Sequence, residues 1–248
     1  MKSSSKGSGG VSLPRLRLEK CTFDGKTWTI DNEQAHHLVR VRRCNTGSFV
    51  EGLLNGVRVK LKLLCYENIV CAEEISRENE LLPQTNIHLL LGLLKNDQLN
   101  EALRFSAEIG VHSIHLLLCE RSVPIYDAQK SEDKMQRWNK ILEEATKQAG
   151  STRPPILKNP IEITKFDFQS LPNCRYAALL SSEPQQIKNI NVPSELAVAI
   201  GPEGDWAPSE SQLLLDNGFI GISLGKRILR ASTAVAVACG SLMLAEDN

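Results

Sequence analysis

The segment IGPEGDW has the composition of a loop that a ligand approaches closely. Gly201 and Gly204 remove side chains at the backbone, and Pro202 stiffens the turn between them. The segment leads into a predicted helix, for which Ser209 and Gln212 would form a capping box. An ordinary strand-to-helix turn explains the same residues, so the segment alone leaves both interpretations open.

The segment LGKRILRAST supplies positive charge beside an apolar helix. Lys226, Arg227 and Arg230 lie within five residues. Because arginine can bind phosphate or stabilise an anionic heterocycle, this loop predicts a site for a charged substrate or one that develops charge. Lys226 and Arg227 fit a solvated loop face equally well, whereas Arg230 stands at the start of the helix. Thr233 can cap that helix or bond a ligand.

Other motifs that would define a site are missing from the sequence. Neither a GxxxxGK[ST] phosphate loop nor a GxGxxG fingerprint occurs, which argues against nucleoside triphosphate and dinucleotide sites. His112 and His115 fall in a predicted strand, where residues three apart point to opposite faces, so we expect structural histidines and no metal. The seven cysteines include no C-x-x-C pair, which favours the reducing cytoplasm over a disulfide framework.

From residue 86 onward, strand-like and helix-like segments alternate, which predicts an α/β domain with a largely parallel sheet. The apolar run NIHLLLG (86–92) is typical of a strand buried on both faces. The predicted strands RYAALLS, ELAVAIG and FIGISLG run into loops at 179–184, 200–206 and 223–233. Because parallel sheets bind ligands beyond the carboxyl ends of their strands, these loops form the candidate site. The final apolar helix, STAVAVACGSLMLA, predicts burial in the core or against a second subunit.

The first part of the chain is β-rich and basic. Asn55-Gly56 followed by alternating residues predicts a hairpin, and NEQAHHLVRVRR predicts one short helix. Residues 1–62 hold 12 Lys and Arg against 5 Asp and Glu, although the whole chain has a formal net charge of zero. This asymmetry indicates a surface that could meet phosphate. No stretch approaches the roughly 18 continuous apolar residues of a membrane span.

These patterns divide the chain into three predicted parts. Residues 1–11 form a disordered tail or a cloning remnant, residues 12–78 a small β-rich domain, and residues 79–248 the α/β domain.

Two motifs together carry a resemblance to a known family. IGPEGDW followed by ISLGKRILRASTA resembles the motif pair of the ribosomal RNA small subunit methyltransferase E (RsmE) family, part of the SPOUT class of knotted methyltransferases. HHLVRVRR resembles the family's N-terminal motif, LLKNDQLNEALRFSAEIGVHSIHLLLCERS its first α/β segment, and RWNKILEEATKQAGSTRPP the following helix and Arg-Pro turn. The resemblance runs in order through nearly everything after residue 12.

The resemblance implies a PUA-like β-barrel domain that binds RNA, followed by a SPOUT methyltransferase domain with a parallel sheet and a C-terminal trefoil knot. It implies a cytoplasmic homodimer that uses S-adenosyl-L-methionine as its cofactor and needs no metal. The implied reaction transfers a methyl group to N3 of a uridine in 16S rRNA. The partner would be the small ribosomal subunit, and the reaction would belong to rRNA processing during ribosome biogenesis.

The resemblance also implies roles for individual residues. Arg230 would stabilise charge on the carbonyl oxygens of the base, and Glu203 is the weaker candidate, as a proton acceptor or as a residue that fixes the loop. The implied cofactor-binding residues are Leu180, Gly201, Pro202, Gly204, Leu224, Gly225, Ile228, Leu229 and Thr233. The implied RNA-binding residues are Arg15, Arg17, Arg40, Arg42 and Arg43, with Arg121 and Arg153 nearer the active site.

The chain departs from the family pattern at three places. Ser232 stands where the family usually has glutamate, Asp205 stands where it has a second glycine, and Lys95-Asn96-Asp97 replaces Lys-Gly-Asp. Three other functions stay open at this point. They are a SPOUT methyltransferase with another RNA target, an RNA-binding or ribosome-assembly factor that has lost catalysis, and an unrelated α/β enzyme acting on a small molecule.

Overall fold

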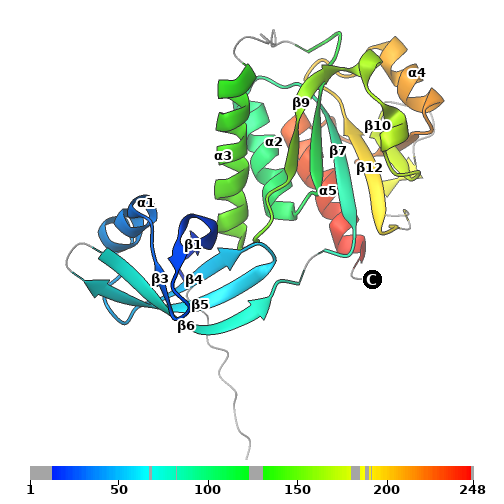
Figure 1. Cartoon of the computed structure of the whole chain (residues 1–248). Coiled ribbons are helices and arrows are strands. Elements are labelled where there is room, and N and C mark those ends of the chain that lie inside the picture. The colour runs from blue at the N-terminus through cyan, green and yellow to red at the C-terminus, as the bar shows by residue number, and fades with distance from the viewer. Residues whose placement is uncertain are drawn as a thin grey trace, which may run out of the picture. The chain divides into compact units, whose positions relative to one another are not determined.

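The chain folds into two compact units, Met1–Glu80 and Leu81–Asn248 (Figure 1). The computed structural model describes residues 13–66, 69–81, 83–122, 131–179, 185–187, 190 and 192–246. The predicted tail at residues 1–11 lies outside the described residues. Within those residues, no helix combines the length and the apolar character that crossing a membrane requires.

The N-terminal unit is built on a curled sheet of six strands in the order β1-β4-β5-β6-β3-β2. The pairs are antiparallel except β1 with β4, and the sheet fits the predicted PUA-like domain. The strands are β1 (Arg15–Arg17), β2 (Thr22–Phe23), β3 (Thr27–Thr29), β4 (Phe49–Leu54), β5 (Val57–Tyr66) and β6 (Ile69–Asn79).

The hairpin and the helix predicted in this unit are both present. Leu54 pairs with Val57, which leaves Asn55 and Gly56 as a two-residue turn with φ of 25° and 87°. The helix α1 (Asn32–His36) continues as a π-turn through Val41. Together the sheet and helix enclose a core that includes Leu16, Leu18, Trp28, Leu38 and Leu61.

The C-terminal unit has a sheet of seven strands in the order β11-β13-β10-β12-β7-β8-β9. Every pair in it is parallel, as the alternating sequence pattern predicts. The strands are β7 (Asn86–Gly92), β8 (Ser113–Leu118), β9 (Ile156–Glu162), β10 (Arg175–Ala178), β11 (Gln185–Gln186), β12 (Glu195–Ile200) and β13 (Ile220–Ser223). The helices are α2 (Asn96–Ile109), α3 (Ser131–Ala149), α4 (Pro208–Asp216) and α5 (Ala231–Glu246).

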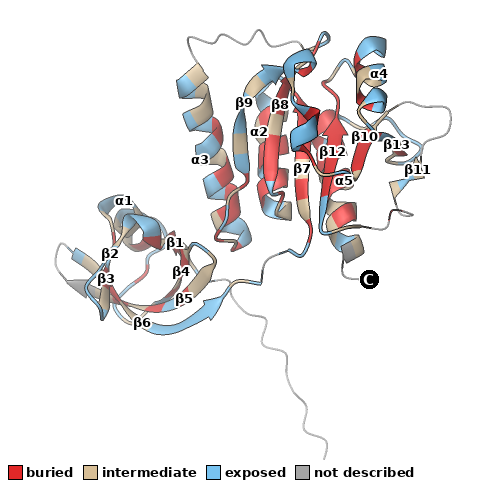
Figure 2. Ribbon diagram, turned by 45° about the vertical axis from the view of Figure 1, so that its right-hand side comes forward, coloured by how far each residue is buried: buried red, intermediate tan, exposed pale blue. Residues whose placement is uncertain are grey.

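Helices cover both faces of this sheet, and its central strands are buried (Figure 2). On β7, Leu89 and Leu91 point into the larger core with α2, α3 and α5, whereas Leu90 points to the opposite face. That second core includes Trp206, Leu214 of α4 and Phe219. A strand buried on both faces requires this double packing, which explains the continuous apolar run of β7.

Two predicted helix starts are wrong. Helix α4 begins at Pro208, where Glu210 Oε2 accepts the Ala207 N–H at 2.8 Å, so Ser209 and Gln212 do not form the capping box. Helix α5 begins at Ala231, and the Ala234 N–H donates to the Arg230 carbonyl at 2.8 Å. Thr233 therefore lies inside the first turn and does not cap it. In both cases the helix starts earlier in the chain than the polar residue that seemed suited to cap it.

A histidine cluster lies toward the amino ends of β7 and β8. His88 Nδ1 is 2.8 Å from Ser113 Oγ, which is 3.1 Å from His115 Nε2. The His115 ring also packs against Phe166, with the ring centroids 5.4 Å apart. The described residues contain no group of His, Cys, Asp and Glu side chains arranged to hold a metal ion.

The burial of His115 predicts a measurable pH dependence of stability. Burial, with smaller effects from His88 and Lys158, lowers the pKa of His115 from 6.5 to about 4. The stability that the neutral ring contributes is therefore complete above pH 6.5 and is lost as the pH falls toward about 4. We expect the Tm of the wild type, measured by circular dichroism, to fall more steeply across this window than the Tm of His115→Asn. The exposed His112→Asn variant is the control, and equal slopes for His115→Asn and the wild type would contradict this account.

Candidate active site

The carboxyl ends of the parallel strands meet at one edge of the sheet, where a cavity opens. The cavity has a volume of ≈ 630 Å³. Its walls are residues 178–179, 200–205 and 222–231, together with Gln98 and Ala234. The site therefore lies beyond the carboxyl ends of β10, β12 and β13, where an open parallel sheet is expected to bind its ligand.

The Gly-Pro-Glu-Gly loop is held by backbone contacts that leave no room for side chains. A methyl group on Gly92, the last residue of β7, would lie 2.5 Å from Pro202 N and 2.6 Å from its Cδ. A methyl group on Gly201 would meet the indole of the buried Trp206, 3.2 Å from Nε1. The loop is therefore clamped between the end of β7 and the Trp206 ring, which fixes its backbone as a wall of the cavity.

The departure at Asp205 has a structural explanation. Asp205 adopts a φ of 61°, in the left-handed region that favours glycine. Its Oδ1 accepts the N–H of Trp206 at 2.8 Å. Aspartate tolerates this conformation better than most side chains because it can hydrogen-bond locally. The replacement of glycine by aspartate therefore keeps the turn.

Two charged side chains tie the loop to its neighbours. Glu203 Oε1 accepts the backbone N–H of Lys95 at 2.8 Å, at the start of α2. Arg121 Nη1 donates to the carbonyls of Gly204 at 3.2 Å and Trp206 at 3.3 Å. The predicted role of Arg121 in RNA binding stays a prediction, and in the structure its exposed side chain also supports this loop.

The loop between β13 and α5 supplies the other wall. Gly225 has a φ of 119°, and Leu224 and Leu229 are half-buried beside the cavity. Ile228 is 92% exposed. Among the described residues, the exposed Arg230 side chain has no ion pair or hydrogen bond, so its guanidinium is available to a ligand.

Two buried acceptors of the cavity have no partner within the described chain. They are Oε1 of Gln98, on the first turn of α2, and Oε2 of Glu203. A buried polar atom without a hydrogen bond is costly, so these oxygens point to a ligand that carries donors.

Most of the residues that the sequence predicted to bind the cofactor lie together around the cavity. Those that line the cavity, with the two predicted catalytic residues, are Gly201, Pro202, Glu203, Gly204, Leu224, Gly225, Ile228, Leu229 and Arg230. Thr233 is exposed on α5 and is not part of the lining, and Leu180 lies outside the described residues. Sequence reasoning missed Gly92 and Gln98. The position of Gly92 at the end of an apolar strand could have drawn attention to it, whereas no sequence pattern marks Gln98.

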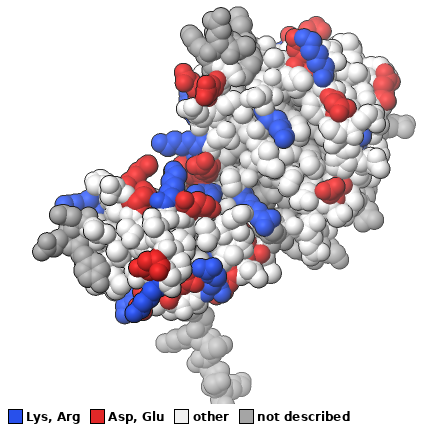
Figure 3. Space-filling model, in the orientation of Figure 1, with Lys and Arg blue, Asp and Glu red and all other residues white. Residues whose placement is uncertain are grey.

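The arginines predicted to bind RNA fall into two groups. Arg15 pairs with Glu51 at 2.6 Å, and the side chain of Arg17 is only 12% exposed, 3.8 Å from Glu19. By contrast, the exposed arginines of this set are Arg40, Arg42, Arg43, Arg121 and Arg153. On the face of the N-terminal unit seen in Figure 3, Lys and Arg lie among Asp and Glu side chains.

Comparison with known proteins identifies the family. Residues 80–243 match the RNA methyltransferase domain family. The ribosomal RNA small subunit methyltransferase E of Synechocystis sp. is 33% identical over 227 residues, which cover 87% of this chain and 72% of the relative. The chain belongs to the RsmE family.

Other RsmE proteins match along the same length. The RsmE protein of Bacillus subtilis is 28% identical over 248 residues, covering 94% of each chain. The crystal structure of the RsmE protein from Neisseria gonorrhoeae, bound to S-adenosyl methionine, has a TM-score of 0.81 at 24% identity. The match covers 94% of this chain and 97% of that one. The predicted fold class, a β-rich domain followed by an α/β domain with a parallel sheet, is thereby confirmed, and the trefoil knot stays a prediction.

Proposed function

We propose that this RsmE protein transfers a methyl group from S-adenosyl-L-methionine to N3 of a uridine in 16S rRNA of the small ribosomal subunit. The observation that carries the proposal is the Arg230 guanidinium, which has no ion pair or hydrogen bond to any described residue and stands at a cavity walled by bare glycine backbone. The test is whether the purified protein forms N3-methyluridine in small-subunit RNA.

The cavity residues fit the proposed cofactor. Leu179, Ile200 and Leu229 offer apolar surface for an adenine ring, and the glycines let a ligand reach the backbone. The unpartnered Oε1 of Gln98 matches the amino, ammonium and hydroxyl donors that S-adenosyl-L-methionine carries. When bound, this cofactor supplies an electrophilic methyl group and leaves as a neutral thioether.

The chemistry requires a negative charge to develop on the uridine. N3 carries a proton and is a poor nucleophile until that proton leaves. Arg230 stabilises the charge that then spreads over the flanking carbonyl oxygens. Glu203 keeps one buried oxygen without a partner in the described chain and accepts the proton. The N3 lone pair would then form the new N–C bond to the methyl group that the cofactor supplies, and the sulfur would keep the electron pair of the broken C–S bond.

Docking of RNA is proposed to rest on the exposed arginines that follow α1. Because phosphate contacts release counterions, RNA affinity is expected to fall steeply with salt. We expect Arg42→Ala combined with Arg43→Ala to weaken binding of small-subunit RNA and to lower the salt slope by about 2. Fluorescence anisotropy at several salt concentrations measures both effects. The matched control is Arg15→Ala, because Arg15 pairs with Glu51, and an unchanged slope in the double variant would contradict the assignment.

The remaining proposals concern assembly and location. The apolar helix α5 leaves Leu244 70% exposed, which supports a homodimer formed through this helix. Among the described side chains, no disulfide joins Cys21, Cys44, Cys71, Cys119, Cys174 or Cys239, which supports a cytoplasmic location. The proposed trefoil knot would form at the loops after β10, β12 and β13.

A further inference from the structure

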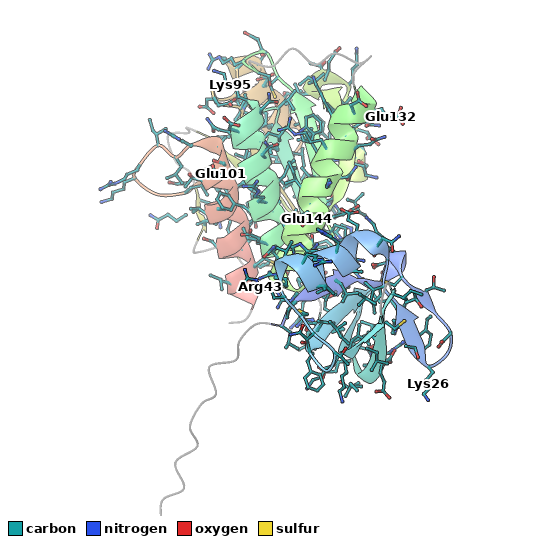
Figure 4. The ribbon with its side chains drawn as sticks, turned by 90° about the vertical axis from the view of Figure 1, so that its left-hand side faces the viewer. Lys26, Arg43, Lys95, Glu101, Glu132 and Glu144 are labelled. Atoms are coloured by element: carbon teal, nitrogen blue, oxygen red, sulfur yellow. The ribbon has the colours of Figure 1, made fainter. Side chains whose placement is uncertain are left out.

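A buried hydroxyl joins the first turn of α5 to α2. Ser232 is fully buried, and its Oγ donates to Glu101 Oε2 at 2.6 Å. The two residues are 131 positions apart in the sequence. In Figure 4, Glu101 lies where α2 and the beginning of α5 come together. The bond therefore links the helix that carries Gln98 to the residue two positions after Arg230.

The surroundings of this bond set the position of Arg230. The Arg230 carbonyl accepts the Ala234 N–H at 2.8 Å, so the backbone of Arg230 already belongs to the first turn of α5. Ser232 lies within that turn, and its bond to Glu101 fixes the turn against α2. The negative charge of Glu101 beside the amino end of α5 also favours the helix dipole. Within the described residues, no hydrogen bond or ion pair holds the Arg230 guanidinium itself.

We propose that Glu101 is a positioning residue for methyl transfer, which acts through Ser232 to hold Arg230 at the cavity. The proposal rests on the proposed function. The proposal also gives a role to Ser232, which stands where the family usually has glutamate. The serine hydroxyl bonds to a carboxylate that α2 supplies. Glu101 does not itself line the cavity.

The first test separates positioning from binding. We expect Glu101→Ala and Ser232→Ala each to lower kcat by about 10- to 100-fold, because a displacement of ~1 Å can cost that much. The Kd of S-adenosyl-L-methionine, measured by calorimetry, is expected to stay within about twofold. The double variant should lose no more than either single variant, because both remove the same bond. Glu101→Gln keeps an acceptor oxygen and should retain most of the activity.

The matched control is Glu108→Ala, an exposed carboxylate two turns further along the same face of α2. It is expected to keep the wild-type kcat. In an Arg230→Lys background, the additional loss caused by Glu101→Ala should shrink, because the group that it positions is already replaced. Two results would overturn the proposal. One is that the losses of kcat caused by Glu101→Ala and Ser232→Ala add in the variant that combines them. The other is that Glu101→Ala lowers kcat equally in the wild-type and the Arg230→Lys backgrounds.

Hydrogen exchange gives a readout that does not depend on activity. We expect the amide of Ala234, which donates to the Arg230 carbonyl, to exchange faster in Glu101→Ala and Ser232→Ala than in the wild type or Glu108→Ala. Unchanged exchange would contradict the inference even if the enzyme is active. A wild-type protein that forms no N3-methyluridine would instead contradict the proposed function.

Discussion

Replacing Arg230 with alanine is expected to lower kcat for methyl transfer by about 10²- to 10³-fold, the usual cost of removing a donor that stabilises developing negative charge. The Kd of S-adenosyl-L-methionine should stay within about twofold, because the guanidinium acts on the base and not on the cofactor. Single-turnover methylation of small-subunit RNA measures the first quantity, and calorimetry with the cofactor alone measures the second.

Arg104→Ala is the matched control for this variant. Arg104 is an exposed arginine on α2 that does not line the cavity, so its removal changes the net charge equally. It is expected to leave both kcat and the Kd of the cofactor near the wild-type values. If Arg230→Ala reduced cofactor affinity as much as turnover, Arg230 would shape the pocket, and its role in stabilising the uridine anion would be wrong.

Gly92→Ala is expected to abolish most cofactor binding although Gly92 does not line the cavity. The added methyl would lie 2.5 Å from Pro202 N and 3.1 Å from the Gly201 carbonyl carbon. Both are backbone atoms, so the Gly-Pro-Glu-Gly loop or the end of β7 must shift. We expect the Kd of S-adenosyl-L-methionine to rise at least about tenfold and the protein to lose about 1–3 kcal/mol of stability, the usual cost of overpacking.

Gly240→Ala makes the same chemical change where space is open. A methyl there would have Ile109 Cδ1 at 4.0 Å as its nearest neighbour, and Gly240 lies inside α5. That variant is expected to keep the wild-type Kd for the cofactor. Wild-type cofactor affinity in Gly92→Ala, determined by calorimetry, would show that the clamp on the loop is not needed for binding.

Local patterns predicted the features that depend on neighbouring residues. The run NIHLLLG is a strand with side chains in both cores, and Asn55-Gly56 forms the two-residue turn of a hairpin. The loops after β12 and β13 could be predicted as one site because parallel strands place their carboxyl ends at the same edge. Strand β9 (Ile156–Glu162) was not predicted, because Pro160 and its polar residues obscure the apolar pattern.

The remaining parts of the site depend on contacts between distant segments. No local pattern indicates that Ser232 bonds to Glu101 or that Glu203 accepts the N–H of Lys95, 108 residues away. Arg121 could be identified as a cation near the site, but the carbonyls that it binds belong to the loop after β12. Such contacts follow from how the sheet orders its strands, which the sequence pattern leaves open.

The central claim is methylation of a uridine at N3, and nucleoside mass spectrometry tests it most directly. Small ribosomal subunits that lack the modification are incubated with the protein and S-adenosyl-L-methionine, with Arg230→Ala and a reaction without cofactor as controls. The account predicts N3-methyluridine in the 16S rRNA of the wild-type reaction and very little in either control. No methylated product, despite cofactor binding measured by calorimetry, would contradict the proposed function, and another methylated nucleoside would contradict N3 of uridine as the target.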